Sequence, residues 1–472
     1  MRVVTAGGSA AGLFSALLLA RAGHDITVLD CDPVEPADDL DAAAATAFRP
    51  AAPQCVQAHA FLPRWRELLI ERLPDVYADL LAAGLAEAPF PTLLPPTITD
   101  RAEQPGDERV TMLAGRRSTM DWVLRRAAAE QPGVTLRQGI AVTGLLATAG
   151  TPPHVTGVRT EHEDITADLV LDATGRRSAV DRWLTGIGAE RSAMRSAECG
   201  LAYYTRHFRL RPSRELPGPA TTRILLALDH FTVGLWCADN GTALFAVAPL
   251  VEDKRFRAVA DPAVHDAVLR TVAAYRPWLD VLEPISDVYP MGGLHNTLRT
   301  FVVDGRPVAT GLLPVGDSVC TTNPTFGRGL VLALQGAIDL VDLVDRLGDD
   351  PDGLARAYWR RVSEVIEPFY VDQAANDAER LADLRRNVFG RPSPPVQHRP
   401  DRVTFGQLRS VAAADPMLFR AFWRLFGMLS RPDDVYTDPA VVGRVTAMLS
   451  DGVTAPPVPQ PSPEAVSAAL AG

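Results

Sequence analysis

Residues 1–12, Met-Arg-Val-Val-Thr-Ala-Gly-Gly-Ser-Ala-Ala-Gly, begin the 472-residue chain with a short apolar run and a turn of small residues. Leucine and alanine then dominate from Leu13 to Ala22, which indicates a helix, and the apolar run Ile26–Asp30 follows. A strand, a helix and a second strand within about 30 residues make a βαβ unit. The start of the chain therefore predicts an α/β fold with a parallel sheet.

The turn in this unit carries the pattern Gly7-x-Ser9-x-x-Gly12, in which serine replaces the middle glycine typical of a dinucleotide-binding turn. Small residues there permit the tight turn and the approach of a pyrophosphate to the helix N-terminus. Asp30 ends the second strand 18 residues after Gly12, where a carboxylate can accept both ribose hydroxyls. We predict a dinucleotide site; the alternative is an ordinary βαβ unit with an acidic loop.

A second candidate contact segment lies far along the chain, after the apolar run Val308–Val315. Gly316 allows a close backbone approach, and Asp317 can accept a hydrogen bond from a ribityl hydroxyl, although it would also suit a helix N-cap. Residues 323–329, Asn-Pro-Thr-Phe-Gly-Arg-Gly, then begin a long helix whose free N–H groups would face the ligand. FAD reaches past the first βαβ unit and needs such a distant segment, so the two motifs together favour FAD over NAD.

With these motifs, the chain resembles the FAD-dependent monooxygenases of the para-hydroxybenzoate-hydroxylase-like superfamily. Within it, the chain is most similar to the branch of flavin-dependent epoxidases and halogenases. The resemblance covers about residues 1–345 and includes a middle motif, residues 172–178, Asp-Ala-Thr-Gly-Arg-Arg-Ser. Single-component hydroxylases usually carry Asp before the glycine of this motif, where the chain has Thr174.

The resemblance also implies which residues contact the cofactor. They are Gly7, Gly8, Ser9, Ala11, Gly12, Asp30, Arg49, Arg117, Val142, Gly175, Gly316, Asp317, Pro324, Gly327 and Gly329. Arg49 and the segment Pro53-Gln54-x-x-Gln57-x-His59 resemble part of the epoxidase-like branch, which has histidine where Gln57 stands. This implies Arg49 and His59 as catalytic residues beside the flavin. Taken without the resemblance, Arg49 would form a loop salt bridge, Arg117 would pair with an acid near its helix start, and His59 would be a half-buried loop residue.

The chain changes to alternating, β-like sequence between residues 202 and 250, where Tyr203, Phe231 and Trp236 are candidates for lining a substrate pocket. We therefore expect a Rossmann-like FAD-binding domain of the glutathione-reductase type with an inserted β-rich substrate domain and a helical C-terminal region. The expected ranges are 1–75, 108–188 and 286–345 for the FAD-binding domain, 76–107 and 189–285 for the substrate domain, 346–454 for the helical region, and 455–472 for a mobile, Pro-rich tail.

The resemblance implies an FAD-dependent monooxygenase that inserts one oxygen atom into an apolar or aromatic small molecule, by hydroxylation or epoxidation, in secondary metabolism. The reaction would use O₂ and pass through a C4a-hydroperoxyflavin. Electrons would come from NAD(P)H or from reduced flavin supplied by a separate flavin reductase, because no second Gly-x-Gly-x-x-Gly follows residue 150. Alternatives are a flavin-dependent halogenase, a flavin reductase or dehydrogenase, and a non-catalytic flavin-binding protein.

Two sequence features favour oxygen transfer over halogenation. Halogenases of the superfamily resemble one another in a Trp-x-Trp-x-Ile-Pro stretch and in a lysine in the N-terminal part. In this chain Trp236 is followed by Cys237 and Ala238, no Trp-x-Trp occurs, and the only lysine is Lys254. Arginine is a poor substitute because its guanidinium stays protonated.

Composition excludes several other classes of function. The net charge is −10 without a basic block, so we expect no nucleic-acid partner. No apolar run reaches the roughly 20 residues that cross a bilayer, so we expect no integral membrane segment. The five cysteines are scattered, without metal-ligand spacing, which predicts no metal site and a reducing, cytoplasmic location. They are Cys31, Cys55, Cys199, Cys237 and Cys320.

Overall fold

A computed structural model describes residues 1–34, 37–392 and 399–472, and its N-terminal part contains the predicted parallel sheet. The strands are β1 (Arg2–Ala6), β2 (Asp25–Asp30), β5 (Val134–Gln138), β9 (Leu169–Asp172) and β19 (Leu312–Pro314). Their order is β19-β9-β1-β2-β5, and every neighbouring pair is parallel. Strands from separated stretches therefore assemble one sheet, which confirms the predicted α/β fold.

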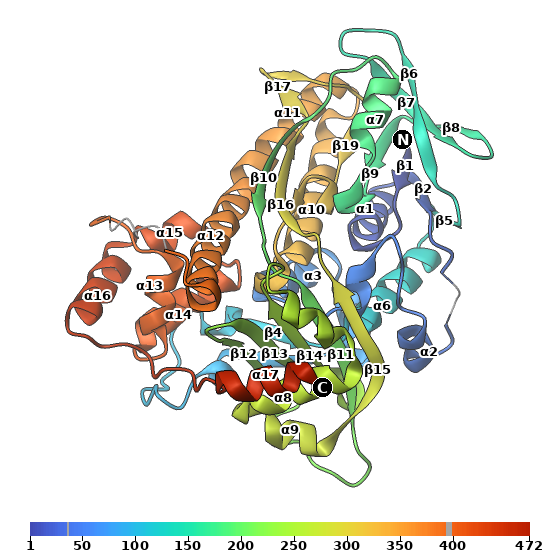
Figure 1. Ribbon diagram of the computed structural model, residues 1–472. Coiled ribbons are helices and arrows are strands. Elements are labelled where there is room, and N and C mark those ends of the chain that lie inside the picture. The colour runs from blue at the N-terminus through green and yellow to red at the C-terminus, as the bar shows by residue number, and fades with distance from the viewer. Residues whose placement is uncertain (35–36, 393–398) are drawn as a thin grey trace.

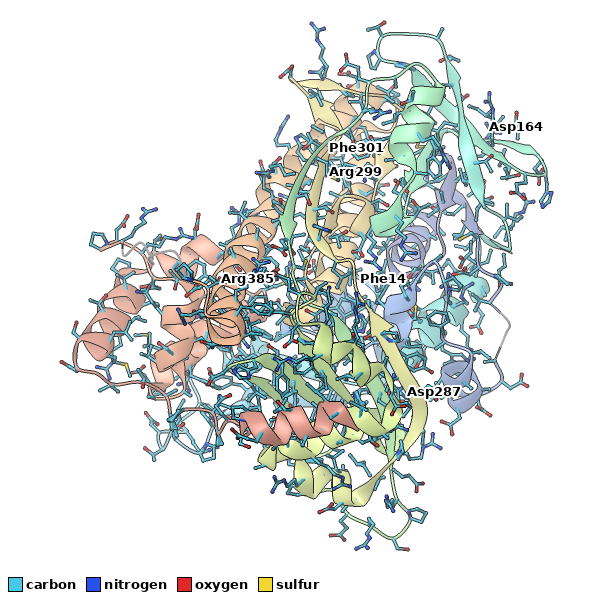
Figure 2. The ribbon with its side chains drawn as sticks, viewed as in Figure 1. Phe14, Asp164, Asp287, Arg299, Phe301 and Arg385 are labelled. Atoms are coloured by element: carbon cyan, nitrogen blue, oxygen red, sulfur yellow. The ribbon has the colours of Figure 1, made fainter. Side chains whose placement is uncertain are left out.

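Five helices contact one another in a ring, in the order α6, α1, α10, α3, α4. They are α1 (Ala10–Arg21), α3 (Pro63–Arg72), α4 (Pro74–Ala82), α6 (Arg117–Glu130) and α10 (Gly329–Leu347). Helix α1 is buried along nearly its whole length, and Phe14, labelled in Figure 2, belongs to the main core. A three-stranded meander of β6 (Val142–Thr148), β7 (His154–Thr160) and β8 (Asp164–Thr166) packs with α7 (Val180–Gly186) and contacts β9.

The predicted β-rich layer is a five-stranded antiparallel sheet in the order β12-β13-β14-β11-β15. Its strands are β11 (Tyr203–Leu210), β12 (Arg223–Ala227), β13 (Phe231–Cys237), β14 (Thr242–Pro249) and β15 (Leu282–Met291). Helices α8 (Pro262–Thr271) and α9 (Arg276–Val281) pack on one face of this sheet. In Figure 1 it lies below the parallel sheet.

The structure differs from the expected domain organisation at three places. The limit at residue 286 falls inside β15, which pairs with β11 in the antiparallel sheet. Residues 76–107, expected in the substrate domain, contribute Val76, Leu80 and Phe90 to the core of the parallel sheet instead. The Pro-rich tail was expected to be mobile, but it ends in helix α17 (Pro463–Ala471), which packs on α8. The physical reason is that Val466 of this helix is buried in the apolar core of the antiparallel sheet.

The C-terminal region is mainly helical, as expected, and short loops connect its helices; residues 393–398 of the predicted range lie outside the described residues. Its helices are α11 (Pro351–Arg361), α12 (Glu367–Phe389), α13 (Phe405–Ala412), α14 (Pro416–Phe426), α15 (Pro432–Tyr436) and α16 (Pro439–Ser450). Helix α12 packs along a three-stranded sheet of β10 (Ala193–Glu198), β16 (His295–Thr300) and β20 (Cys320–Thr321). Arg385 of α12, labelled in Figure 2, forms ion pairs with Glu198 and Glu252.

The remaining elements are short. They are α2 (Leu40–Ala45), α5 (Phe90–Leu93), β3 (Ala86–Pro89), β4 (Thr111–Ala114), β17 (Val302–Val303) and β18 (Arg306–Pro307). Among the described residues, no helix combines the length and the apolar character that a bilayer crossing requires.

Candidate functional site

A cavity of about 410 Å³ lies at the carboxyl ends of β1, β2 and β9, the edge where doubly wound sheets bind ligands. It extends to the start of α10. The predicted cofactor and catalytic residues that line it are Gly7, Gly8, Ser9, Ala11, Asp30, Arg49, His59, Arg117, Val142, Gly175, Asp317, Pro324, Gly327 and Gly329. The structure thus brings together, in one cavity, residues spread over more than 300 positions of the chain.

Two predicted residues, Gly12 and Gly316, lie beside this cavity rather than on its wall. A Cβ on Gly12 would stand 2.0 Å from the carbonyl oxygen of Gly7, so only glycine lets α1 begin so close to the turn. Gly316 has φ +60°, and a Cβ there would stand 2.5 Å from the Cβ of Ala11. Gly12 therefore permits the tight first turn, and Gly316 lets the segment after β19 approach the start of α1.

One end of the cavity is organised around the carboxylate of Asp30. Arg49 Nη2 donates to both of its oxygens, at 2.7 and 2.6 Å, and Arg125 Nη2 donates to Oδ2 at 2.6 Å. Arg49 Nε also lies 3.3 Å from Asp32 Oδ2. Asp30, Cys31 and Asp32 could together hold a metal ion by their spacing, but Arg49 already occupies both carboxylates.

This end of the cavity changes the interpretation of two arginines. Arg49 was predicted beside the flavin ring, but its guanidinium pairs with Asp30 and Asp32, so the simpler expectation of a loop salt bridge describes its position. Arg125 was not predicted. It lies two helical turns after Arg117 on α6, and that spacing on one helix was the available signal.

His59 and Arg117 contact each other on another part of the wall. His59 Nδ1 lies 2.9 Å from the carbonyl oxygen of Gln57 and must donate to it, so Nε2 accepts from Arg117 Nη1 at 3.2 Å. Burial and the positive charge of Arg117 lower the pKa of His59 to about 4. Arg117 also donates through Nε to Asp121 at 2.9 Å, the helix-start acid expected for it. His59 is therefore a neutral acceptor at neutral pH, and its catalytic role stays a prediction.

Asp317 provides a carboxylate on the wall between the turn after β19 and the start of α10. Burial raises its pKa to about 6, although Arg117 and Arg176 act in the opposite direction. No hydrogen bond to this carboxylate occurs within the described part of the chain. Gly329 and Leu330, the first residues of α10, also line the cavity, so the positive end of a 19-residue helix faces it.

The middle motif holds two parts of this wall together. Asp172 is fully buried and accepts hydrogen bonds from Thr174 Oγ1 at 2.6 Å, Ser178 Oγ at 2.6 Å and Ser318 Oγ at 3.2 Å. Ser318 in turn accepts from the backbone N–H of Gly175 at 2.8 Å. The turn after β9 is thereby fixed to the segment that carries Asp317.

A second, smaller cavity adjoins the first and shares Ala58 and Pro324 with it. Its lining comes mainly from one face of the antiparallel sheet: Gln57, Ala58, Tyr203, Thr205, Leu225, Thr232, Val233, Gly234, Trp236, Ala246, Ala248, Met291, Pro324 and Thr325. Of the predicted aromatic residues, Tyr203 and Trp236 belong to it. Phe231 does not. It lies five positions from Trp236 on the same strand and therefore faces the opposite side of the sheet, where it packs on Phe256 in the core.

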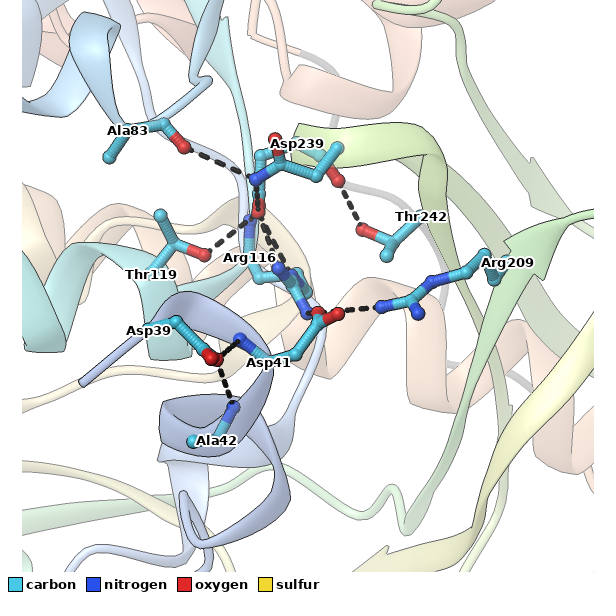
Figure 3. Close-up of polar contacts among 10 residues, drawn as sticks. Asp39, Asp41, Ala42, Ala83, Arg116, Thr119, Arg209, Asp239 and Thr242 are labelled. Atoms are coloured by element: carbon cyan, nitrogen blue, oxygen red, sulfur yellow. Dashed lines mark hydrogen bonds and ion pairs between the residues drawn. The ribbon is translucent and has the colours of Figure 1, made fainter. Parts of the chain in front are cut away.

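A buried ion pair connects the antiparallel sheet to the start of α6, next to Arg117 (Figure 3). Asp239, in the turn between β13 and β14, accepts from Arg116 N at 2.6 Å, Nε at 3.0 Å and Nη2 at 2.7 Å. Thr119 Oγ1 donates to it as well, at 2.9 Å. Arg116 and Asp239 are only 1% and 2% exposed, so the pair is withdrawn from water and holds the sheet against the cavity wall.

Comparison with known sequences finds a similar curated protein. Protein Rv3254 of Mycobacterium tuberculosis is 26% identical over 478 residues, 94% of this chain and 93% of that protein. No protein-family model matches the chain.

Solved structures show a clearer likeness. The flavin-dependent brominase Bmp2 superposes with a TM-score of 0.64 at 14% identity, over 96% of this chain and all of the other. The flavin-dependent halogenase CmlS gives 0.58 at 17% identity, over 96% of this chain and 77% of the other. PqsL of Pseudomonas aeruginosa, a probable FAD-dependent monooxygenase, gives 0.57 at 15% identity, over 82% of this chain and 98% of the other. The chain therefore shares the fold of these flavin-dependent enzymes, which confirms the fold class expected from the resemblance.

Proposed function

From this fold and its cavity, we propose that the chain binds FAD and works as a monooxygenase that inserts one oxygen atom into an apolar or aromatic small molecule. The observation that carries the proposal is the pair of adjoining cavities, one lined by both predicted FAD motifs and the other by the antiparallel sheet. Hydroxylation and epoxidation both fit this arrangement.

Different residues of the larger cavity suit different parts of FAD. Asp30 would accept the ribose hydroxyls in place of part of its contacts with Arg49 and Arg125. The N–H groups at the start of α1 would hold the pyrophosphate; Ser9 at the N-cap makes no side-chain capping bond, so its hydroxyl is free for the ligand. Asp317 would accept a ribityl hydroxyl, because its buried carboxylate faces the cavity without a hydrogen-bonded partner in the described chain.

When bound and reduced, FAD would supply the electrons and the oxygen-transfer chemistry for the reaction with O₂. The chain's own residues would bind the cofactor, orient the substrate and shield the reaction from water. Arg117, Arg176 and the positive end of α10 would stabilise negative charge near Asp317. Neutral His59 would hold the guanidinium of Arg117 in place without adding a charge, and the apolar side chains of the second cavity would exclude water.

The first test is cofactor binding. Purified protein should bind one FAD per chain non-covalently, since the motifs at residues 7–12 and 316–317 contain neither cysteine nor histidine. Acid precipitation should release all of the yellow colour to the supernatant. Flavin retained in the pellet, or NAD binding without flavin affinity, would contradict the proposal.

The second test concerns the electron donor. We expect slow direct reduction by NAD(P)H and faster turnover with a separate flavin reductase, since Thr174 replaces the Asp that single-component relatives carry. Stopped-flow absorbance should show bleaching of the bound flavin with NADPH plus reductase and little with NADPH alone. Rapid bleaching by NADPH alone, with or without added aromatic probe, would make this expectation wrong.

Halogenation is the second candidate function, because the two halogenating enzymes Bmp2 and CmlS share the fold. Lys254, the only lysine, is exposed, donates to the carbonyl oxygen of Val251 at 2.7 Å and lines neither cavity. A neutral lysine amine is therefore absent from both cavity walls, which supports oxygen transfer. We retain the cytoplasmic location as a prediction on the five free cysteines.

The two candidates predict different products from the same incubation. Protein, FAD, NAD(P)H and a flavin reductase should be incubated with a cell extract in ¹⁸O₂ with excess chloride and bromide. We expect products heavier by one ¹⁸O atom. Products that carry halogen and no ¹⁸O would favour the halogenase, and a boiled-protein incubation is the control.

A further inference from the structure

A buried network of side-chain amides joins α12 to the wall shared by the two cavities. Asp377 of α12 accepts hydrogen bonds from Asn296 Nδ2 at 2.7 Å, Asn323 Nδ2 at 3.0 Å and Gln373 Nε2 at 3.0 Å. Asn323 immediately precedes Pro324, which lines both cavities. Figure 1 shows α12 running beside β16, the strand that carries Asn296, so the C-terminal region reaches the cavity wall through this network.

The direction of the Asn323 amide is fixed by its neighbours. An ionised Asp377 can only accept, so the atom of Asn323 that faces it must be Nδ2, and Oδ1 then faces Tyr203 and Thr325. Asn296 is fixed independently, because its Oδ1 accepts from the backbone N–H of Asn323 at 2.7 Å.

The hydroxyl groups on this side of the second cavity direct their protons into the protein. Tyr203 donates to Asn323 Oδ1, and Thr325 Oγ1 lies 2.7 Å from the Tyr203 hydroxyl and 3.0 Å from the same Oδ1. Thr205 donates its proton to Gln57 Oε1 at 2.6 Å. These three hydroxyls therefore offer lone pairs to the cavity, and a ligand beside them satisfies them by donating a hydrogen bond.

We propose that Asp377 is a positioning residue that fixes the Asn323 amide, and that the Tyr203 end of the cavity consequently selects substrates carrying a hydroxyl or amine donor. The inference rests on the proposed function, since it takes the second cavity as the substrate site. It assigns a role to α12, which contributes no side chain to the lining of either cavity.

The variant Asp377→Asn gives a result that a purely structural role would not produce. Its new amide nitrogen has one favourable place, facing Asn323 and Gln373. Both of these amides can turn over to accept from it. Asn323 then gives up the long hydrogen bond, 3.3 Å, that its Oδ1 accepts from the backbone N–H of Thr325, and the Gln373 Oε1 that now lacks a partner gains one. Asn296 is held more firmly, because its Oδ1 accepts from the backbone N–H of Asn323 at 2.7 Å. The turned Asn323 donates to the Tyr203 oxygen, and the tyrosine proton moves to the cavity.

Phenol and anisole are the matched probes, because anisole has the same ring but no O–H donor. FAD-loaded protein should be titrated with each by calorimetry near pH 8, where Asp377 is ionised because burial raises its pKa only to about 6. We expect the wild-type protein to bind phenol about 3–10-fold more tightly than anisole, the value of one hydrogen bond. In Asp377→Asn this preference should vanish or invert.

Two further variants complete the test. Tyr203→Phe should lower the affinity for phenol and leave the affinity for anisole unchanged, which keeps the proposal testable if Asp377→Asn fails to fold. Asp383→Asn, on the same helix and 43% exposed, is the matched control and should keep the preference for phenol. Equal binding of the probes by the wild-type protein, or an unchanged preference in Asp377→Asn, would overturn the inference. Loss of FAD binding itself would instead contradict the proposed function.

Discussion

Asp239→Ala should lower the free energy of unfolding by about 3–5 kcal/mol, because it leaves the guanidinium of Arg116 buried without its main counter-charge. Asp239 is also the acceptor for Thr119 and for the backbone N–H of Arg116, so one substitution leaves several donors unpaired. Urea unfolding followed by circular dichroism and by tryptophan fluorescence measures the loss.

A matched control is available on the surface. Asp280 pairs with Arg270 at 3.1 Å, but the two side chains are 67% and 53% exposed. Asp280→Ala should therefore change the free energy of unfolding by less than about 1 kcal/mol. Equal losses for the two variants would show that the buried pair contributes no more than a surface pair. The double variant Arg116→Met/Asp239→Leu should recover part of the loss, because it removes both buried charges together.

Asp317→Asn should weaken FAD binding by about 10–100-fold, because a hydrogen bond to a charged acceptor contributes about 1.5–3 kcal/mol. Asp30→Ala should also weaken binding, through the adenosine end. Titration of FAD-free protein, followed by quenching of flavin fluorescence, measures both affinities. Asp349→Asn, at an exposed position outside both cavities, is the control. An unchanged FAD affinity in folded Asp317→Asn protein would refute the assignment.

The same substitution should affect the FAD-free protein in the opposite direction. The pKa of Asp317 is raised in the folded chain, to about 6, because of burial. The group therefore favours folding below its unfolded pKa of about 4, and this contribution is lost as pH rises to 6. The amide of Asp317→Asn does not ionise, so the variant does not lose this stability. FAD-free variant protein should therefore be more stable than wild type near pH 7, by on the order of 1 kcal/mol. Melting temperatures at pH 4 and pH 7 measure the difference.

The fold was predictable because its signals are local. The turn at Gly7, the long helix from Gly329 and the alternation around Phe231–Cys237 depend on neighbours within a few residues, and each element lies where these patterns indicate. The turns at Gly7 and Asp317 also identified two parts of the cavity wall. Helix α17 was missed, since the proline residues before it suggested a mobile tail, while its burial depends on α8, about 200 positions earlier.

The site was harder to predict where charges from distant segments meet. The sequence shows that Arg49 and Asp30 are both near the N-terminus, but only the folded chain shows that they pair. Arg116, the residue just before α6, was not predicted, because its role depends on Asp239, more than 100 positions later in the chain. The amide network around Asp377 joins β16, the turn before α10 and α12, and no spacing within the sequence indicates it.

The shared wall of the two cavities imposes a thermodynamic relation on their ligands. Ala58 and Pro324 line both spaces, so a ligand that shifts these residues in one cavity alters the free energy of occupying the other. Linkage then requires reciprocity: if the smaller ligand tightens the binding of the larger one by some factor, the larger ligand tightens the smaller by the same factor. Each ligand can be titrated in the absence and in the presence of the other. The two ratios of dissociation constants must be equal, and this common ratio is the coupling constant.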